Sequence, residues 1–286
     1  MPSYSDLPAG LRRLTSPLPF QGLAWALSPD GLGTVSGMLG VNLSETWTVL
    51  VVETSGCGFL PDRRPQILYE RHYFHRLTQG KYDDGDISDP TAGGYGAAGA
   101  HQYERLERAT QKDRIAALQS TSWGIGQLMG ANHAQGGFAD VEAMVLAMSE
   151  SEDRQLTAMG RFLISAGLNV ALKAHNWVAF ANGYNGPDYS INRYDTRLKA
   201  EFNKCCAGGL PDLNERAVQL YLTYLGLHPG PIDGFAGTRT FSALAEFQEK
   251  RGLAITSTIN ATLVAQLRAE VGGPTRRSTN SNSRVM

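Results

Sequence analysis

Apolar side chains recur at helical spacing through most of the chain. Within residues 140–148, the positions Val141, Met144, Val145 and Met148 share one face of a helix, which is the spacing of an amphipathic α-helix. Similar patterns predict further helices at residues 43–54, 101–118, 153–168, 171–180 and 193–202. The first 206 residues are therefore expected to be mainly α-helical.

Residues 65–74 depart from this pattern. They read PQILYERHYF, follow a turn and are rich in residues that favour β-structure, so we expect a strand there. His72 and His75 would point to opposite faces of that strand, which argues against a shared metal ion. The glycine-rich run 91–99 is expected to be a loop. It lacks the spacing and the lysine of a phosphate-binding loop, which argues against nucleotide binding.

A different pattern begins after residue 206. Residues 207–211, AGGLP, are small and flexible and are expected to be a linker. Asp212 and Glu215 have the capping-box spacing of a helix start. Thr240 is expected to cap a second helix that Gly252 ends, and residues 261–270 a third. We expect a three-helix bundle over residues 212–271 and a disordered polar tail over 272–286.

Composition narrows the classes of function. The chain has 286 residues, a 42% hydrophobic share and a net charge of −1, so no positive field recruits nucleic acid. The apolar run at residues 49–52 is too short to span a membrane, and prolines interrupt any secretory signal near the N-terminus. We expect synthesis in the cytoplasm without a signal peptide, and no membrane insertion. Three cysteines and no H-E-x-x-H segment argue against a zinc site, and we expect no cofactor.

Glu53 is the leading candidate for chemistry. It closes the apolar run at residues 49–52 and precedes a glycine-containing loop at residues 54–59. Apolar neighbours disfavour the charged form of a carboxyl group and raise its pKa, which suits a general acid at neutral pH. Judged from these local residues alone, a glutamate that ends a helix and faces water is an equal alternative.

Three motifs connect Glu53 to known enzymes. Residues 53–59 (ETSGCGF) resemble the ES-x-G segment of goose-type lysozymes and lytic transglycosylases. Residues 121–130 (TSWGIGQLMG) resemble their S-x-G-x-x-Q segment, and residues 180–187 (FANGYNGP) their A-Y-N-x-G-P segment. Residues 53–96, with their FLPD and ILYERH runs, are similar to the N-acetylmuramidase domain of phage endolysins, and this similarity extends over most of residues 15–206.

The resemblance implies an α+β lysozyme-like catalytic domain over residues 1–206, with a small β-hairpin region. It also implies cleavage of the β-1,4 bond between N-acetylmuramic acid and N-acetylglucosamine. Glu53 would protonate the leaving oxygen, and Glu70 would be the second carboxylate, which stabilises positive charge or positions water. Ser88 or Thr91 would hold the attacking water. An ion pair of Glu70 with a neighbouring arginine is the structural alternative.

Sugar rings pack on aromatic faces and acetamido groups bind amides. The residues expected to contact substrate on this ground are Tyr95, Trp123, Gln127, Tyr184 and Asn185. Trp123 and Tyr184 are equally plausible as core aromatics. Cys57 lies between glycines with no base indicated nearby, so we expect it to have a small packing role.

Residues 218–253 resemble the peptidoglycan-binding module found on many cell-wall hydrolases. The resemblance rests on VQ, LG, PG, IDG, T, FQ and GL in the order and spacing of that module. It implies peptidoglycan as the partner, bound by a monomer. The wall-binding candidates are Asp233, Gly234, Thr240, Phe247 and Gln248, with a structural role in the bundle as the alternative at each position.

The combined expectation is an endolysin, a peptidoglycan hydrolase that reaches the cell wall after holin-type release. A lytic transglycosylase, which forms a 1,6-anhydro product, shares the motifs and is the nearest alternative. The presence of Glu70 favours hydrolysis, because one glutamate suffices for the transglycosylase. A non-catalytic wall-binding protein is the alternative from another class.

Overall fold

The structure is a computed structural model that describes residues 18–53 and 57–272, without the side chains of Glu53 and Asp188. The chain divides into two compact units, Met1–Pro211 and Asp212–Met286. Of the predicted tail, residues 273–286 lie outside the described residues.

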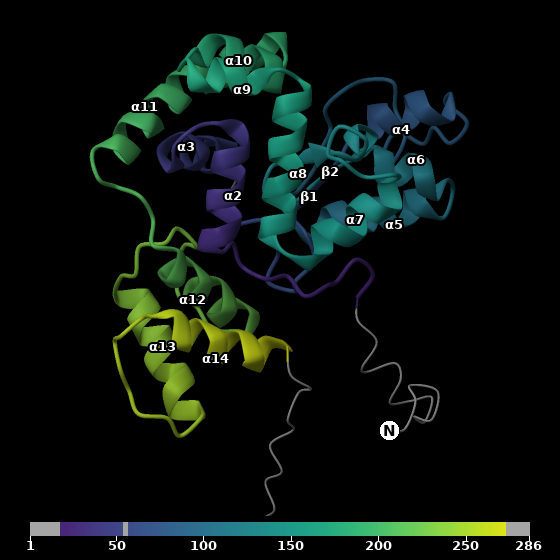
Figure 1. Cartoon of the computed structure of the whole chain (residues 1–286). Helices are drawn as coiled ribbons and strands as arrows, with labels where there is room; N and C mark the ends of the chain where they lie inside the picture. The colour runs from purple at the N-terminus through teal and green to yellow at the C-terminus, as the bar shows by residue number, and fades with distance from the viewer. Residues whose placement is uncertain (1–17, 54–56, 273–286) are drawn as a thin grey trace, which may run out of the picture. The chain divides into compact units, whose positions relative to one another are not determined.

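The first unit is helical with one small sheet (Figure 1). Its α-helices, in chain order, are α2 (Pro29–Leu39), α3 (Leu43–Glu53), α4 (Arg71–Thr78), α5 (Ala100–Thr110), α6 (Arg114–Gln119), α7 (Val141–Glu150), α8 (Glu152–Ser165), α9 (Leu168–Lys173), α10 (Trp177–Asn185) and α11 (Tyr194–Cys206). Short 3-10 helices, η2 (Gly130–Asn132) and η3 (Pro187–Asn192), complete the helical elements described there.

The sheet consists of β1 (Ile67–Tyr69), β2 (Thr121–Trp123) and β3 (Leu128–Met129), antiparallel in that order. Ile67 lies opposite Trp123, and Trp123 lies opposite Leu128. The hairpin between β2 and β3 carries the second motif. The predicted fold class, a mainly helical domain with a small β-hairpin region, is confirmed.

The prediction of a strand over residues 65–74 is wrong for the second half of that range. The strand β1 ends at Tyr69, and the chain enters helix α4 at Arg71. The amides of Tyr73 and Phe74 donate to the carbonyl oxygen of Glu70, which starts the helical turn. A helix buries Phe74 completely while it leaves its charged neighbours nearer solvent, and this packing outweighs the local β-propensity.

Two expected helices are each broken into two. The helix expected over residues 101–118 stops at Thr110 and restarts at Arg114, because the Asp113 side chain accepts from the amide of Ala116 and caps a new helix. The helix expected over 171–180 is interrupted in the same way, by Asn176 at the start of α10. Asp and Asn are favoured caps, so these residues end one helix pattern and begin another.

Helix α8 lies between two groups of elements in the first unit (Figure 1). On one side are the sheet and α4 to α7, and on the other α2 and α3; α2 packs on α8, and α3 packs on α11. The side of the sheet contains a core cluster that includes Tyr69, Phe74, Tyr103 and Trp123. The carboxyl end of α3 and the amino end of α4 thus come from opposite sides of α8.

Membrane-spanning length is not reached by any single helix among the described residues. Within residues 18–53 and 57–272, one bent pair of helices, Pro29–Leu39 and Leu43–Val52, attains the required length and hydropathy together, across a bend of 103°.

As far as it is described, to residue 272, the second unit contains three helices, α12 (Leu213–Tyr224), α13 (Thr238–Lys250) and α14 (Ala261–Gly272). Helix α12 packs on both others. Asp212 caps α12 as predicted, through the amides of Asn214 and Glu215. Glu215 does not complete the capping box, because its carboxylate accepts from the amide of Ala236. The three-helix fold class is confirmed.

Thr240 is not the cap of α13. The helix begins at Thr238 with Gly237 in the capping position, and Thr240 lies inside the first turn. Its buried hydroxyl donates to the carbonyl oxygen of Pro229. Thr240 therefore ties the start of α13 to the preceding turn.

Candidate active site

Glu53 is the last residue of α3, and its side chain lies outside the described parts of the structure. The last turn before it is well held, because Val49, Leu50 and Val52 are buried. The guanidinium of Arg197, on α11, donates to the carbonyl oxygen of Val52 at 3.1 Å. A cation on the last carbonyls of a helix is stabilising. The backbone that carries Glu53 is thus fixed by α11.

Glu70 connects β1 to α4. Its amide donates to the carbonyl oxygen of Ser120 at 2.8 Å, and its own carbonyl oxygen accepts the first bonds of α4. Its side chain is 13% exposed and makes no capping hydrogen bond to the helix. The backbone is therefore fixed on both sides, while the carboxylate stays available for other groups.

The pKa of Glu70 lies above its ordinary value. Burial is the larger cause, because it disfavours the charged form, and a hydrogen bond from the Tyr95 hydroxyl opposes it. The pKa of Tyr95 is raised in turn by burial and by the nearby charge of Glu70. The two side chains therefore face each other, which joins one predicted catalytic residue to one predicted substrate-binding residue.

Arg105 and Gln102, both on α5, fix the glycine-rich loop that carries Tyr95. The carbonyl oxygen of Tyr95 accepts from the Arg105 guanidinium at 2.8 Å and from the Gln102 amide at 2.7 Å. The guanidinium also binds the carbonyl oxygen of Gly94 and pairs with Asp86 at 2.6 Å. The loop contains neither helix nor strand up to Gly99, as expected. Tyr95 itself is 38% exposed, so it is accessible to a ligand.

Ser88 and Thr91 are placed differently from each other. Ser88 is completely buried, and its hydroxyl donates to the carboxylate of Asp83, which also pairs with His75 at 2.8 Å. The Ser88 hydroxyl is thus engaged inside the loop, which corrects the expectation that it holds the attacking water. Thr91 is exposed, and its amide donates to Asp89.

Trp123 and Gln127 support the fold around the second motif. Trp123 is completely buried on β2, and its indole nitrogen donates to the carbonyl oxygen of Leu118. This corrects the expectation that its ring packs on a sugar, because no face of it is open. Gln127 has a positive φ of 44° and donates to the carbonyl oxygens of Gly124 and Gln66. The amide of Gln127 thus closes the β2–β3 turn.

Tyr184 joins the third motif to the second. Its hydroxyl donates to the carbonyl oxygen of Gly126 at 2.6 Å, and its ring lies against Phe180 and Phe162. Asn185 is the last residue of α10 and is partly exposed. The structure therefore brings together motifs that are separated by more than 50 residues in the chain.

Two buried residues of α8, Glu152 and Gln155, were not singled out from the sequence. The carboxylate of Glu152 is fully buried and accepts from the amides of Gly58 and Leu27, each at 2.8 Å. The side chain of Gln155 donates to the carbonyl oxygen of Gly58 and accepts from the amide of Ile125. Helix α8 thus holds the segments of the first and second motifs together.

Gly58 shows how close this packing is. A Cβ atom there would lie 1.8 Å from the amide oxygen of Gln155 and 3.0 Å from the backbone nitrogen of Ile125. Neighbouring Cys57 is buried, and its thiol donates to the carbonyl oxygen of Phe59, which fits the packing role expected for it.

The two histidines of α4 lie on a different kind of element from the one predicted. His72 and His75 lie on a helix and not on a strand, so the argument that they face opposite sides of a strand does not apply. His75 pairs with Asp83, and Nδ1 of His72 lies 3.3 Å from Oε2 of Glu70. Within residues 18–53 and 57–272, no group of three or more His, Cys, Asp or Glu side chains is arranged to hold a metal ion.

Gln219 is the central residue of the second unit. Its buried side chain accepts from the amides of Asp233 and Gly234 and donates to Oδ1 of Asp233. Asp233 also accepts from the amide of Phe235, so it bonds to the turn backbone as expected. Gln219 thus fixes the turn between α12 and α13.

The wall-binding candidates of the second unit are mainly internal. Thr240, Phe247 and Gln248 are buried, with 2–3% exposure, and Gly234 is buried as well. This corrects the expectation that these side chains contact the wall, since the pattern maintains the fold. Asp233 is exposed. A pocket of about 440 Å³ between α13 and α14 includes Gln248 among its lining residues.

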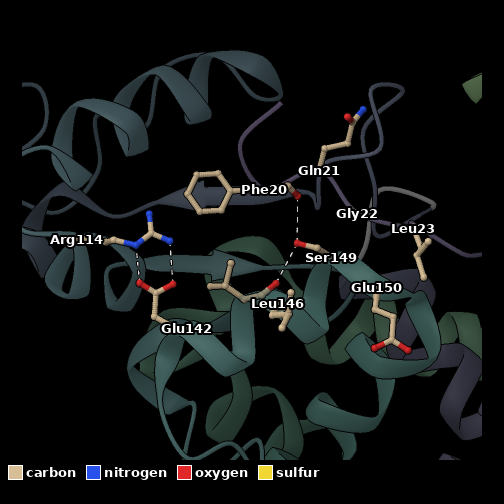
Figure 2. Close-up of a pocket in the computed structure, with 10 residues that line it drawn as sticks. Phe20, Gln21, Gly22, Leu23, Arg114, Glu142, Leu146, Ser149 and Glu150 are labelled. Atoms are coloured by element: carbon tan, nitrogen blue, oxygen red, sulfur yellow. Dashed lines mark hydrogen bonds and ion pairs between the residues drawn. The ribbon is translucent and has the colours of Figure 1, made fainter. Parts of the chain in front are cut away.

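A larger pocket, of about 540 Å³, lies between residues 20–23 and α7 (Figure 2). Figure 2 shows Arg114 facing Glu142 at one end, and these two form an ion pair with a shortest distance of 2.5 Å. Leu146 projects between that pair and Glu150, which pairs with Arg154. The lining contains none of the candidate catalytic residues. This pocket is therefore separate from the candidate site.

Comparisons with known proteins agree with this arrangement. The sequence model of the N-acetylmuramidase family matches residues 42–206, which is more than half of the chain, and that of a peptidoglycan-binding domain matches residues 214–267. The crystal structure of the Burkholderia AP3 phage endolysin is similar at 38% sequence identity and a TM-score of 0.59, over 65% of this chain and 72% of that chain. No curated protein sequence matches. The chain therefore belongs to the N-acetylmuramidase family, glycoside hydrolases that act on peptidoglycan, and carries a peptidoglycan-binding domain.

Proposed function

We propose that this protein is an endolysin that hydrolyses the β-1,4 bond between N-acetylmuramic acid and N-acetylglucosamine. The observation that carries the proposal is the partly buried Glu70 carboxylate, fixed through its backbone and facing Tyr95, in a unit of the N-acetylmuramidase family. Likeness to a phage endolysin supports action on the bacterial wall, and the proposal includes holin-type release as the route to it.

In this mechanism Glu53 is the general acid. It gives its proton to the glycosidic oxygen as the bond to the anomeric carbon breaks. Glu70 is the second carboxylate. Either it takes the proton of the water whose oxygen bonds to that carbon, or its negative charge stabilises the oxocarbenium-like centre while the deprotonated Glu53 takes that proton. Tyr95 lies beside Glu70 with a partly exposed ring, where it is suited to pack on a sugar face. Thr91, Tyr184 and Asn185 remain candidates for contacts at this site.

The test is mass spectrometry of purified peptidoglycan digested by the wild-type protein, Glu53→Gln and Glu70→Gln. We expect reducing N-acetylmuramic acid ends from the wild type and a loss of rate of at least about 100-fold in each variant, within the range that general acid–base catalysis contributes. Glu104→Gln is the matched control, because that carboxylate is 74% exposed.

Each other outcome removes a defined part of the proposal. Products with a 1,6-anhydro ring would identify a lytic transglycosylase. Full activity of Glu53→Gln would remove the proton donor, and full activity of Glu70→Gln would remove the second carboxylate. Binding to walls with no cleavage by the wild type would leave a non-catalytic wall-binding protein.

A further inference from the structure

Polar atoms that are buried and lack a hydrogen-bond partner gather in one place. Over the described residues, such side-chain atoms are Oε2 of Glu70, Nε of Arg71, Nδ1 of His72 and Nε of Arg105. Buried polar groups are normally paired, because an unpaired one loses its hydration without compensation. Three of these residues are consecutive at the start of α4, and the fourth fixes the loop of Tyr95.

Two of these atoms face each other. Nδ1 of His72 lies 3.3 Å from Oε2 of Glu70, within ion-pair distance, and neither atom has a hydrogen bond to any other group in the described structure. A nitrogen–oxygen hydrogen bond typically measures 2.7–3.2 Å, so a small rotation of the ring suffices to form one. The other two atoms belong to guanidinium groups already bound elsewhere, Arg71 to the Gly85 carbonyl and Arg105 to Asp86.

We infer that His72 is a positioning residue for Glu70, which donates its Nδ1 proton to Oε2 and holds the carboxylate charged and oriented toward the substrate. This inference rests on the proposed function, in which Glu70 is the second carboxylate. His72 touches no substrate in it. It acts only through Glu70. His72 contacts the carboxylate from α4, and Tyr95 contacts it from the glycine-rich loop.

Helix α4 makes this arrangement specific. Glu70 occupies the capping position of α4, where a short side chain such as that of aspartate or serine accepts from an amide of the first turn. Glu70 does not do so here. Instead its side chain lies beside His72, two residues farther along the same helix. A donor at that position supplies the carboxylate with a hydrogen bond that no amide of the first turn provides.

The charged and titratable groups around the pair determine how it responds to pH. Tyr95 faces Glu70 from the glycine-rich loop, and Arg71 and Arg76 face His72 from α4. Burial and then these two arginines lower the pKa of His72, which favours the neutral ring. A neutral ring donates to Oε2 of Glu70 only when its proton is on Nδ1. Loss of that donor removes stabilisation of the Glu70 carboxylate, which raises the pKa of Glu70 further.

The experiment is the pH profile of glycan cleavage by full-length His72→Ala, His72→Asn and His72→Gln. Activity falls at low pH as Glu70 takes up a proton, so we expect His72→Ala to move this acidic limb upward by about one pH unit. We expect kcat to fall and KM to stay within about two-fold. His72→Asn places an amide N–H near the Nδ1 position and is expected to restore the limb, whereas His72→Gln is not.

The control is His228→Ala, which removes an exposed histidine of the second unit, outside the candidate active site, and is expected to keep the wild-type profile. An unchanged acidic limb in His72→Ala would overturn the inference. If Glu70→Gln is inactive at the same time, the proposed function stands and only the role of His72 is lost. Full activity of Glu70→Gln would instead remove the proposed function of that carboxylate.

A second measurement does not depend on activity or on the folding of a His72 variant. The titration of His72 is followed by NMR in the wild type and in Glu70→Gln. We expect the pKa of His72 to fall in the variant, because its negatively charged partner is gone. An unchanged His72 pKa would show that the two side chains do not interact and would overturn the inference by itself.

Discussion

The carboxylate of Asp86 has an effect on the site that extends beyond its own loop. It pairs with the guanidinium of Arg105, which in turn binds the carbonyl oxygens of Gly94 and Tyr95. Burial opposes ionisation of Asp86, but hydrogen bonds from Arg108 and Arg105 outweigh it and hold the pKa below its ordinary value. Asp86 therefore supports the loop that presents Tyr95, although it belongs to none of the three short motifs.

We predict that Asp86→Asn destabilises the first unit by about 1–2 kcal/mol at pH 7, because Arg105 then lacks its partner charge. Asp86 is itself two-fifths exposed, which keeps the effect at this size. A carboxylate with a lowered pKa contributes stability above its unfolded pKa, and this contribution is lost as the pH falls through the folded value. The difference should therefore shrink toward pH 3.

Urea unfolding at pH 7 and pH 3 measures this effect. Asp30→Asn is the control, because Asp30 is exposed on the first turn of α2. An equal loss of stability at both pH values would contradict the assignment to charge.

Residue roles could be predicted from the sequence only where the contacts are local. Asp212 was identified as a cap and Asp233 as a turn residue, because both bond to amides two or three positions away. The sequence left two roles open for Trp123, a sugar contact and a core aromatic, and it did not indicate that Ser88 is buried, because these environments depend on Asp83 and on the core around β2. The local sequence gives the chemical groups of a residue. It does not give the distant residues that bury those groups in the folded protein.

Helix α8 is the element that connects the motifs, and it was predicted only as an amphipathic helix. Glu152 and Gln155 reach segments 94 and 97 residues earlier in the chain, so no local pattern contains these contacts. The periodicity of the sequence did indicate where most helices exist. The periodicity did not indicate that helices end before Asp113 and Asn176. Each of these residues caps a new helix, although the apolar pattern continues through it.

Glu152→Gln tests the function of α8. The amide nitrogen of glutamine is a donor and cannot accept from the amides of Gly58 and Leu27, which would leave at least one of them unpaired. We expect a loss of about 2–3 kcal/mol, which corresponds to roughly 5–10 °C in Tm for a unit of this size. Differential scanning calorimetry measures the change.

Glu150→Gln is the control, because Glu150 lies two residues before Glu152, is 40% exposed and pairs with Arg154 at 3.4 Å. Its expected effect is below about 1 kcal/mol. A Glu152→Gln variant with the stability of Glu150→Gln would show that α8 does not hold these segments through the carboxylate.

The whole molecule combines a unit with the candidate catalytic carboxylates and a unit that matches a peptidoglycan-binding domain. Attachment of a binding unit to a catalytic one raises the effective concentration of the catalyst at an insoluble substrate. It adds nothing when the substrate is a small soluble fragment. The benefit of the second unit should therefore depend on the physical form of the glycan.

We predict that residues 1–211 alone cleave soluble glycan fragments at the rate of the full chain. On insoluble walls at low enzyme concentration, the same piece should be at least about 10-fold slower. Sedimentation with purified walls and turbidity assays measure both properties. Residues 212–286 alone serve as the control and should sediment without clearing the suspension. Equal clearing by the short and full chains would argue against a binding role for the second unit.

The bare start of helix α4 also has an evolutionary consequence. A serine, asparagine or aspartate in place of Glu70 would bond to the first turn and strengthen the helix by about 1 kcal/mol, and the present side chain forgoes this gain. On the proposed mechanism, the protein gives up stability there so that the Glu70 carboxylate is not bound by its own helix and can face Tyr95 and His72. Selection for thermal stability alone would favour such replacements. On that mechanism, the resulting proteins would be more stable but would no longer lyse bacteria.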